Sequence, residues 1–231
     1  TLEAKIAAAV RAGSTEVDRR RWQSLPAPVV AGEAQRLAAT IGAWLEHGER
    51  GRPPFTVRET ELRSPLVLGG LELTLQIDRV DTLPEGGVAI VDYKSGRTVA
   101  PKRWFADRPT GTQVGLYALA WKARDPDTPV RAVAYVRVKA GEIGVDGLAA
   151  DVAVWPALDA PADLRMAALP DWTAVEARFA ATLGDLVDDF RAGDARVAPR
   201  DAGACRYCDQ KPLCRVRALD DEAVASGDAD G

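Results

Sequence analysis

The chain has 231 residues, of which 47% are hydrophobic and 28% are charged, so it is long enough to bury the core of one medium-sized domain. Its formal net charge of −4 excludes a strong overall attraction to nucleic acid, although clustered cations or bound metal ions still recruit phosphate locally. No apolar run approaches the roughly 20 residues of a membrane helix and no secretory signal opens the chain, so we expect a cytoplasmic protein with no membrane partner.

Residues 1–54 are expected to form a helical segment. The Ala-rich stretch 2–11 has high helix propensity, and residues 30–50 carry an apolar stripe at helical spacing that includes Trp44. The sole histidine, His47, lies in the last turn, where a histidine more often balances the helix dipole than binds a metal. Because the chain opens inside a helical pattern without an initiator Met, we also expect it to be a piece of a larger polypeptide.

Two predicted strands form the centre of the chain. Residues 71–80 alternate apolar and polar side chains, with Asp78 in the polar set, and a turn at residues 82–87 leads into the apolar run 88–91. This run ends in Asp92, Tyr93 and Lys94, and because side chains alternate along a strand, Asp92 and Lys94 share one face. The predicted hairpin presents Asp78 and Asp92 beside Lys94, an arrangement typical of a divalent-metal site with a cationic partner.

The segments around this hairpin predict further strands and helices. Residues 55–68 and 130–139 read as strands, residues 144–155 add another, and residues 171–192 form an amphipathic helix whose apolar stripe is core. Trp104 and Phe105, in a loop at residues 101–109, either stack on bases or pack the loop onto the core, and packing is the commoner arrangement.

The next predicted helix, residues 110–123, carries Gln113 and Tyr117. Their i, i+4 spacing puts both polar tips on one face of the helix. One interpretation is a core tyrosine with a nearby amide. The other is a face that positions the backbone of a nucleic acid.

The three cysteines form one cluster, with Cys205 and Cys208 in a CxxC pair and Cys214 five residues further on. Such clustering in a cytoplasmic protein favours metal ligation over disulfides, but a zinc or iron–sulfur site needs four ligands and only three are present. The residues after 219 are acidic and rich in Gly and Ala, and we expect them to be a disordered tail.

Three separated elements occur in the order typical of one known family. Ile77-Asp78, then Val91-Asp92-Tyr93-Lys94, then Gln113 to Tyr117, together with the terminal cysteines, resemble the RecB-type branch of the PD-(D/E)XK nuclease superfamily. The resemblance implies an α/β fold, a restriction-endonuclease-like mixed central β-sheet flanked by α-helices. The nuclease core would span residues 55–199, after the helical segment 1–54 and before a cysteine-cluster segment at 200–219 and a tail at 220–231.

The resemblance also implies site residues. Asp78, Asp92 and the backbone carbonyl of Tyr93 would bind Mg²⁺ or Mn²⁺, and Lys94 would orient or help activate the attacking water. Glu61 is a further candidate ligand, with a surface carboxylate as the equally weighted alternative. Gln113 and Tyr117 would hold the DNA backbone.

The expected activity is that of a Mg²⁺- or Mn²⁺-dependent deoxyribonuclease, in particular an exonuclease, in a DNA repair or recombination protein with a helicase subunit or domain as partner. Similarity to the AddB type implies that Cys205, Cys208 and Cys214 join an upstream cysteine around a 4Fe-4S cluster. That cysteine is absent from this chain, so we expect the cluster to be absent or incomplete here.

Two alternatives remain open. The family commonly has a further metal ligand on an upstream helix, and nothing before residue 55 fits it well. The chain would then be inactive by itself, as a catalytically incomplete nuclease-like module that binds DNA or serves a structural role in a helicase–nuclease complex. The other alternative is a metal-stapled interaction domain whose acidic strands are merely solvated.

Overall fold

A computed structural model describes residues 1–17, 25–206 and 208–214. The chain divides into two compact units, Thr1–Gly184 and Asp185–Gly231, and each is treated by itself below. The tail predicted at residues 220–231 lies outside the described residues. Within the described part of the chain, no helix combines the length and the apolar character needed to cross a membrane.

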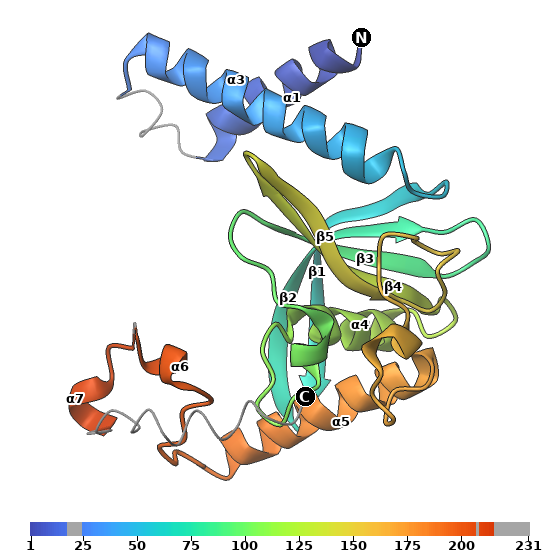
Figure 1. Ribbon diagram of the computed structural model, residues 1–231, viewed down its shortest axis with the longest axis vertical. Helices are drawn as coiled ribbons and strands as arrows, with labels where there is room; N and C mark the ends of the chain where they lie inside the picture. Colours follow the sequence, from blue (N-terminus) through green and yellow to red (C-terminus); the bar gives the residue numbers. More distant parts are fainter. Residues whose placement is uncertain (18–24, 207, 215–231) are drawn as a thin grey trace. The chain divides into compact units, whose positions relative to one another are not determined.

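The first unit is built on a five-stranded mixed sheet with the strand order β1-β2-β3-β4-β5 (Figure 1). Neighbouring strands run antiparallel except for β3 and β4, which are parallel. A parallel pair needs a crossover connection, and here it contains the short helix η2 (Pro101–Trp104) and α4 (Gln113–Arg124). The strands are β1 (Thr56–Leu68), β2 (Leu71–Thr82), β3 (Val88–Lys94), β4 (Val130–Lys139) and β5 (Glu142–Ala149).

One face of the sheet packs against α4 and the first turns of α5 (Trp172–Arg191). Phe105 stacks on Phe179 of α5 with ring centroids 5.0 Å apart, and Trp104 and Phe105 are both buried. This aromatic pair therefore packs against the core and is not exposed for stacking on bases. The close approach of α4 to α5 requires Gly115, because a Cβ there would lie 2.7 Å from the Phe179 ring.

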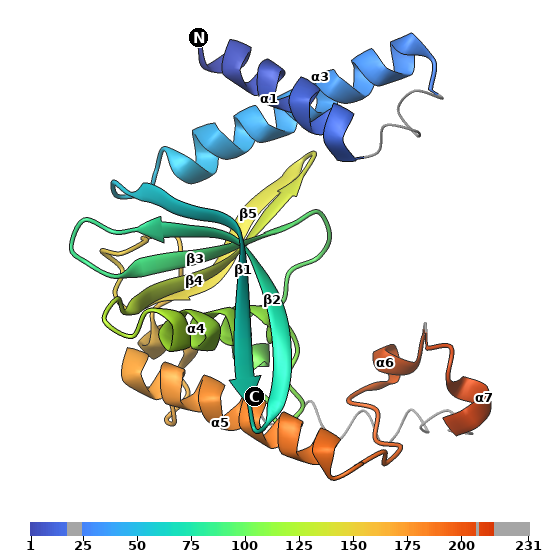
Figure 2. The same cartoon turned by 180° about the vertical axis from the view of Figure 1, so that it is seen from behind.

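The other face lies beneath α3 (Ala27–Trp44), which runs on into a π-helical turn, η1 (Leu45–Glu49) (Figure 2). This face of β3 and β4 is lined with small side chains, and Trp44 and Trp155 pack against them. The helix α1 (Leu2–Val17) contacts α3. The predicted mixed sheet flanked by helices is confirmed.

Most predicted elements differ from the observed ones only at their ends. The strand expected at residues 144–155 ends earlier, at Ala149, and is followed by turns and a short helix, η3 (Pro161–Leu164). In the second unit the cysteine segment contains two short helices, α6 (Ala202–Arg206) and α7 (Lys211–Cys214).

Candidate active site

The two central carboxylates lie next to each other where β2 leaves β3. Arg79 and Val91 form the last pair of the antiparallel β2–β3 ladder, and Asp78 and Asp92 are the residues directly beyond it. The backbone N–H of Tyr93 donates to Asp78 Oδ2 over 2.8 Å. Strand alternation puts Asp78 and Asp92 on the same side of the sheet as α4. The hairpin thus brings the two acidic residues together, as the sequence pattern predicts.

Asp92 is buried, with only 1% of its surface exposed. Burial raises the pKa of this carboxyl above its ordinary value, Lys94 opposes the shift, and the neighbouring charge of Asp78 adds to it. Lys94 Nζ lies 2.6 Å from Asp92 Oδ2, yet within the described residues no donor reaches this oxygen in hydrogen-bond geometry. Two adjacent carboxylates, one with a buried oxygen that lacks a hydrogen bond, fit a hard divalent cation such as Mg²⁺ or Mn²⁺.

A chain of hydrogen bonds links α4 to these residues. Lys94 Nζ donates to Gln113 Oε1 over 2.6 Å, and Gln113 Nε2 donates to the Tyr117 hydroxyl oxygen over 2.5 Å. Burial raises the pKa of Tyr117, with Asp92 as the next cause, so the phenol keeps its proton. That proton is available to Asp92, whose pKa the contact with Tyr117 lowers. The i, i+4 pair is thus directed at the acidic site, with Tyr117 buried and Gln113 partly exposed.

Glu61 is not gathered into this site. It is exposed on β1, it adopts a positive φ of 51°, and its carboxylate accepts a hydrogen bond from Gln76. Across residues 1–17, 25–206 and 208–214, no set of three or more His, Cys, Asp or Glu side chains comes together as a metal-binding group. Of the candidate ligands, only Asp78 and Asp92 therefore lie together among the described residues, and His47 is exposed on η1.

The three cysteines are partly buried free thiols. Cys205 lies on α6, Cys214 ends α7, and Cys208 lies between the two helices. Within the described part of the chain, the three thiols do not come together as a set of metal ligands. The expected iron–sulfur ligation therefore has no support in the geometry of this segment.

Tyr135 is a residue of the site that sequence reasoning missed. It pairs with Asp92 in the parallel register of β3 and β4 and is almost fully buried. Its hydroxyl donates to the carbonyl oxygen of Gly111 over 2.7 Å and accepts from the backbone N–H of Val114 over 3.4 Å. Burial raises the pKa of Tyr135 to about 12, so the hydroxyl is neutral. The sequence shows only a tyrosine in a strand, which predicts a core position.

On the opposite face of the sheet, a cluster of four largely buried charged side chains contacts Tyr93 of β3. Arg79 bonds the Tyr93 hydroxyl over 2.8 Å, Glu49 over 2.7 Å and Asp81 over 2.6 Å. Arg52 bonds the other oxygen of Asp81 over 2.9 Å and lies 3.6 Å above the ring of Trp155. Two arginines and two carboxylates cancel in charge, so the cluster is neutral as a whole. Nothing in the sequence pattern indicates that these residues meet.

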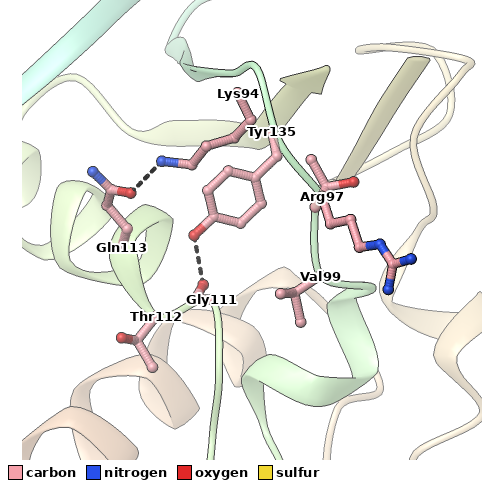
Figure 3. A pocket seen from close by; sticks show the side chains of 8 residues that line it. Lys94, Arg97, Val99, Gly111, Thr112, Gln113 and Tyr135 are labelled. Atoms are coloured by element: carbon pink, nitrogen blue, oxygen red, sulfur yellow. Dashed lines mark hydrogen bonds between the residues drawn. The ribbon is translucent and has the colours of Figure 1, made fainter. Parts of the chain in front are cut away.

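An open pocket of about 270 Å³ lies beside Lys94 (Figure 3). Lys94 and Gln113 belong both to its lining and to the acidic site. The remaining walls come from the segment after β3, including Arg97 and Val99, from the residues that lead into α4, and from Tyr135 of β4.

Comparison with known proteins gives one match that is sufficient to assign a family. The family model of the PD-(D/E)XK nuclease superfamily matches residues 2–215. None of the curated proteins compared with the chain matches it. Among solved structures, the crystal structure of SSO0001 is similar at 14% identity, with 89% of this chain and 80% of that chain covered and a TM-score of 0.34, which is too low to support an argument. The family match spans nearly all described residues, including Asp78, Asp92 and Lys94, and the mixed sheet with flanking helices agrees with the restriction-endonuclease-like fold. The chain therefore belongs to the PD-(D/E)XK nuclease superfamily.

Proposed function

We propose that the chain is a Mg²⁺- or Mn²⁺-dependent nuclease that hydrolyses phosphodiester bonds in DNA, with Asp78, Asp92 and Lys94 as its active site. Membership of a nuclease superfamily implies DNA as substrate. The observation that carries the proposal is the junction of β2 and β3, where the two carboxylates are neighbours and Lys94 Nζ lies 2.6 Å from Asp92.

Asp78, Asp92 and the backbone carbonyl of Tyr93 would hold the cation. Once bound, a divalent metal supplies Lewis-acid stabilisation of the phosphate and lowers the pKa of a bound water. The donor set fits this role, because hard cations prefer oxygen ligands and one Asp92 oxygen has no hydrogen bond. The Arg79–Tyr93 contact fixes the strand that carries the carbonyl.

Lys94 has a distinct task. Its ammonium group has three donor protons, of which one is donated to Gln113, while Asp92 Oδ2 is an ion-pair partner 2.6 Å away without hydrogen-bond geometry. The remaining protons are left for an attacking water or a phosphate oxygen, where the cation orients the nucleophile and stabilises negative charge that develops during reaction. Gln113 and Tyr117 keep Lys94 and Asp92 in place, and Gln113, the more exposed of the two, is also our candidate for contact with the DNA backbone.

The experiment is cleavage of end-labelled single- and double-stranded DNA with Mn²⁺ or Mg²⁺. We expect metal-dependent products from the wild type and a loss of at least about 100-fold in Asp92→Asn and Lys94→Ala. Asp127→Asn is the matched control, because Asp127 is an exposed carboxylate in the turn after α4. Equal cleavage by all variants, or no cleavage by the wild type, would refute the assignment.

A second candidate is favoured by one observation, the gathering of only two carboxylates among the described residues. The chain would then be a nuclease-like module that binds DNA without cutting it. The same assay separates the two candidates when DNA binding is measured in parallel. Binding without metal-dependent cleavage supports the second candidate.

We further propose a more specific function within the superfamily, that of a RecB/AddB-like exonuclease of DNA repair with a helicase partner. In this proposal Cys205, Cys208 and Cys214 bind a 4Fe-4S cluster. It is supported by the order of the sequence motifs and the cysteine spacing alone. Iron and acid-labile sulfide analysis of the purified protein tests it. About four of each per chain would support the cluster, and zinc without iron would exclude it.

A further inference from the structure

The pocket beside Lys94 contains side chains, Arg97 among them, that the proposed cleavage reaction does not use. None of its lining residues is acidic, although Asp and Glu outnumber Lys and Arg in the chain by 34 to 30. Two cations, Lys94 and Arg97, and the hydroxyl-bearing Thr98 and Thr112 contribute to its wall. It is thus a locally cationic pocket in an acidic protein, and a local excess of positive charge favours an anion.

Arg97 is the cation of this pocket that has no fixed partner. Its side chain is exposed, and within the described residues it forms no hydrogen bond or ion pair. Its charge acts at longer range on Glu142, where it contributes to lowering the pKa of that carboxyl. Lys94, in contrast, is engaged with Asp92 and Gln113. In Figure 3, Lys94 and Gln113 lie on one side of the Tyr135 ring and Arg97 on the other. A free guanidinium presents a planar fork of donors that matches two phosphate oxygens.

The walls of the pocket are held in place by buried side chains. Trp104 Nε1–H donates to the Val99 carbonyl over 3.0 Å, and the Tyr135 hydroxyl donates to the Gly111 carbonyl over 2.7 Å. Gly111 has a φ of +70°, and a Cβ there would lie 3.1 Å from Val99 and from Trp104. The Thr98 hydroxyl donates to Asp146, which ties the segment to β5. A pocket formed in advance spares a ligand the cost of ordering it.

We propose that this pocket binds the phosphate of the nucleotide next to the scissile one, with Arg97 as its principal cation. The proposal rests on the proposed function, since the scissile phosphate is assigned to Asp78 and Asp92. Lys94 contacts Asp92 and also lines the pocket, so a strand held at the carboxylates passes Lys94 before it meets Arg97. The Val99 side chain and the Tyr135 ring offer apolar surface to the intervening sugar. Arg97 is a positioning residue that sets the register of the strand.

The first test measures binding of a fluorescein-labelled single-stranded oligodeoxynucleotide by anisotropy in EDTA, where no metal-dependent cleavage occurs. Arg97→Ala should weaken binding about tenfold and reduce the slope of log K against log salt by about 0.7, the value for one lost phosphate contact on a single strand. Arg97→Lys should restore part of the affinity. Arg124→Ala is the matched control, because Arg124 is an exposed arginine in the last turn of the same helix whose first turn borders the pocket.

The second test uses oligonucleotides with a single neutral methylphosphonate on either side of the cleaved bond. In the wild type, one adjacent position should lower kcat/KM by about tenfold. In Arg97→Ala the same replacement should cost nothing further, because the cation that it faced is gone. An additive loss, or an unchanged affinity and salt slope in Arg97→Ala, overturns the subsite while leaving the nuclease assignment intact. Absence of metal-dependent cleavage by the wild type refutes the proposed function instead.

Discussion

Asp81→Asn is predicted to be among the most destabilising conservative substitutions in the protein. The Asp81 side chain is fully buried and accepts three hydrogen bonds, from Arg52 Nη1 at 2.9 Å, Arg79 Nε at 2.6 Å and Arg79 Nη2 at 2.9 Å. Replacement by Asn keeps the shape but removes the negative charge, so a neutral cluster of two arginines and two carboxylates acquires a net charge of +1.

The magnitude follows from the burial of the remaining charges. Arg52 has 2% of its side chain exposed and Arg79 has 11%, so neither is rescued by water. Breaking a buried pair by removing one partner costs about 3–5 kcal/mol, which is a large part of the roughly 5–15 kcal/mol that stabilises a typical domain. For a chain of this size the midpoint of thermal unfolding should fall by roughly 6–20 °C.

Urea unfolding followed by circular dichroism measures this loss. Asp125→Asn is the matched control, because Asp125 pairs with Arg58 over 2.8 Å at a partly exposed position, where an ion pair is worth only about 0–1 kcal/mol. A loss below about 1 kcal/mol in Asp81→Asn, or equal losses in both variants, would refute the reasoning. Since Arg79 also bonds the Tyr93 hydroxyl, cleavage by Asp81→Asn should fall even at temperatures where the variant is folded.

The remaining predictions concern the site itself. Tyr135→Phe should lower the free energy of unfolding by about 1–3 kcal/mol, because the Gly111 carbonyl loses its donor and the N–H at residue 114 loses its acceptor while the ring stays. Urea unfolding measures this loss, and a value under about 0.5 kcal/mol, the size of an exposed contact, would contradict the prediction. Asp92→Asn should be more stable than wild type at pH 7.5 in EDTA. Burial raises the folded-state pKa of Asp92 above its ordinary value, so at high pH the wild type is destabilised by an ionised buried carboxylate. This disadvantage disappears as the pH falls through the folded-state pKa toward the ordinary value, because the carboxyl is then protonated. Paired unfolding curves at pH 7.5 and pH 4 check it, and a wild type that is the more stable at pH 7.5 would reverse the sign. Added Mn²⁺ should raise the melting temperature of wild type and leave that of Asp92→Asn unchanged, because a ligand that binds only the folded state stabilises it; equal shifts in both would place the ion elsewhere.

Local patterns were sufficient for much of the fold. Strand alternation in residues 71–80 and the acidic end of the run 88–94 predict the β2–β3 hairpin, and the observed register does bring Asp78 and Asp92 together. The i, i+4 spacing of Gln113 and Tyr117 predicts their common face, and both do meet along one face of α4. Such features depend on backbone periodicity, which nearby residues set. Helix and strand ends were less well predicted, because tertiary contacts decide them, as in β5, which ends at Ala149.

The tertiary structure decided what these groups can do chemically. The burial of Asp92, the bond from Lys94 to Gln113 and the support from Tyr135 all depend on how the crossover helix packs on the sheet. The Arg52–Asp81 pair joins residues that are 29 apart in the chain. Likewise, the sequence suggests Glu61 and the three cysteines as metal ligands, but in the described part of the structure they do not form a metal-binding group. Residue type and spacing along the chain thus determined which groups are present and which face of an element they share. Long-range packing determined their burial, their partners and the cationic pocket beside Lys94, because these depend on distances in space that no local pattern encodes.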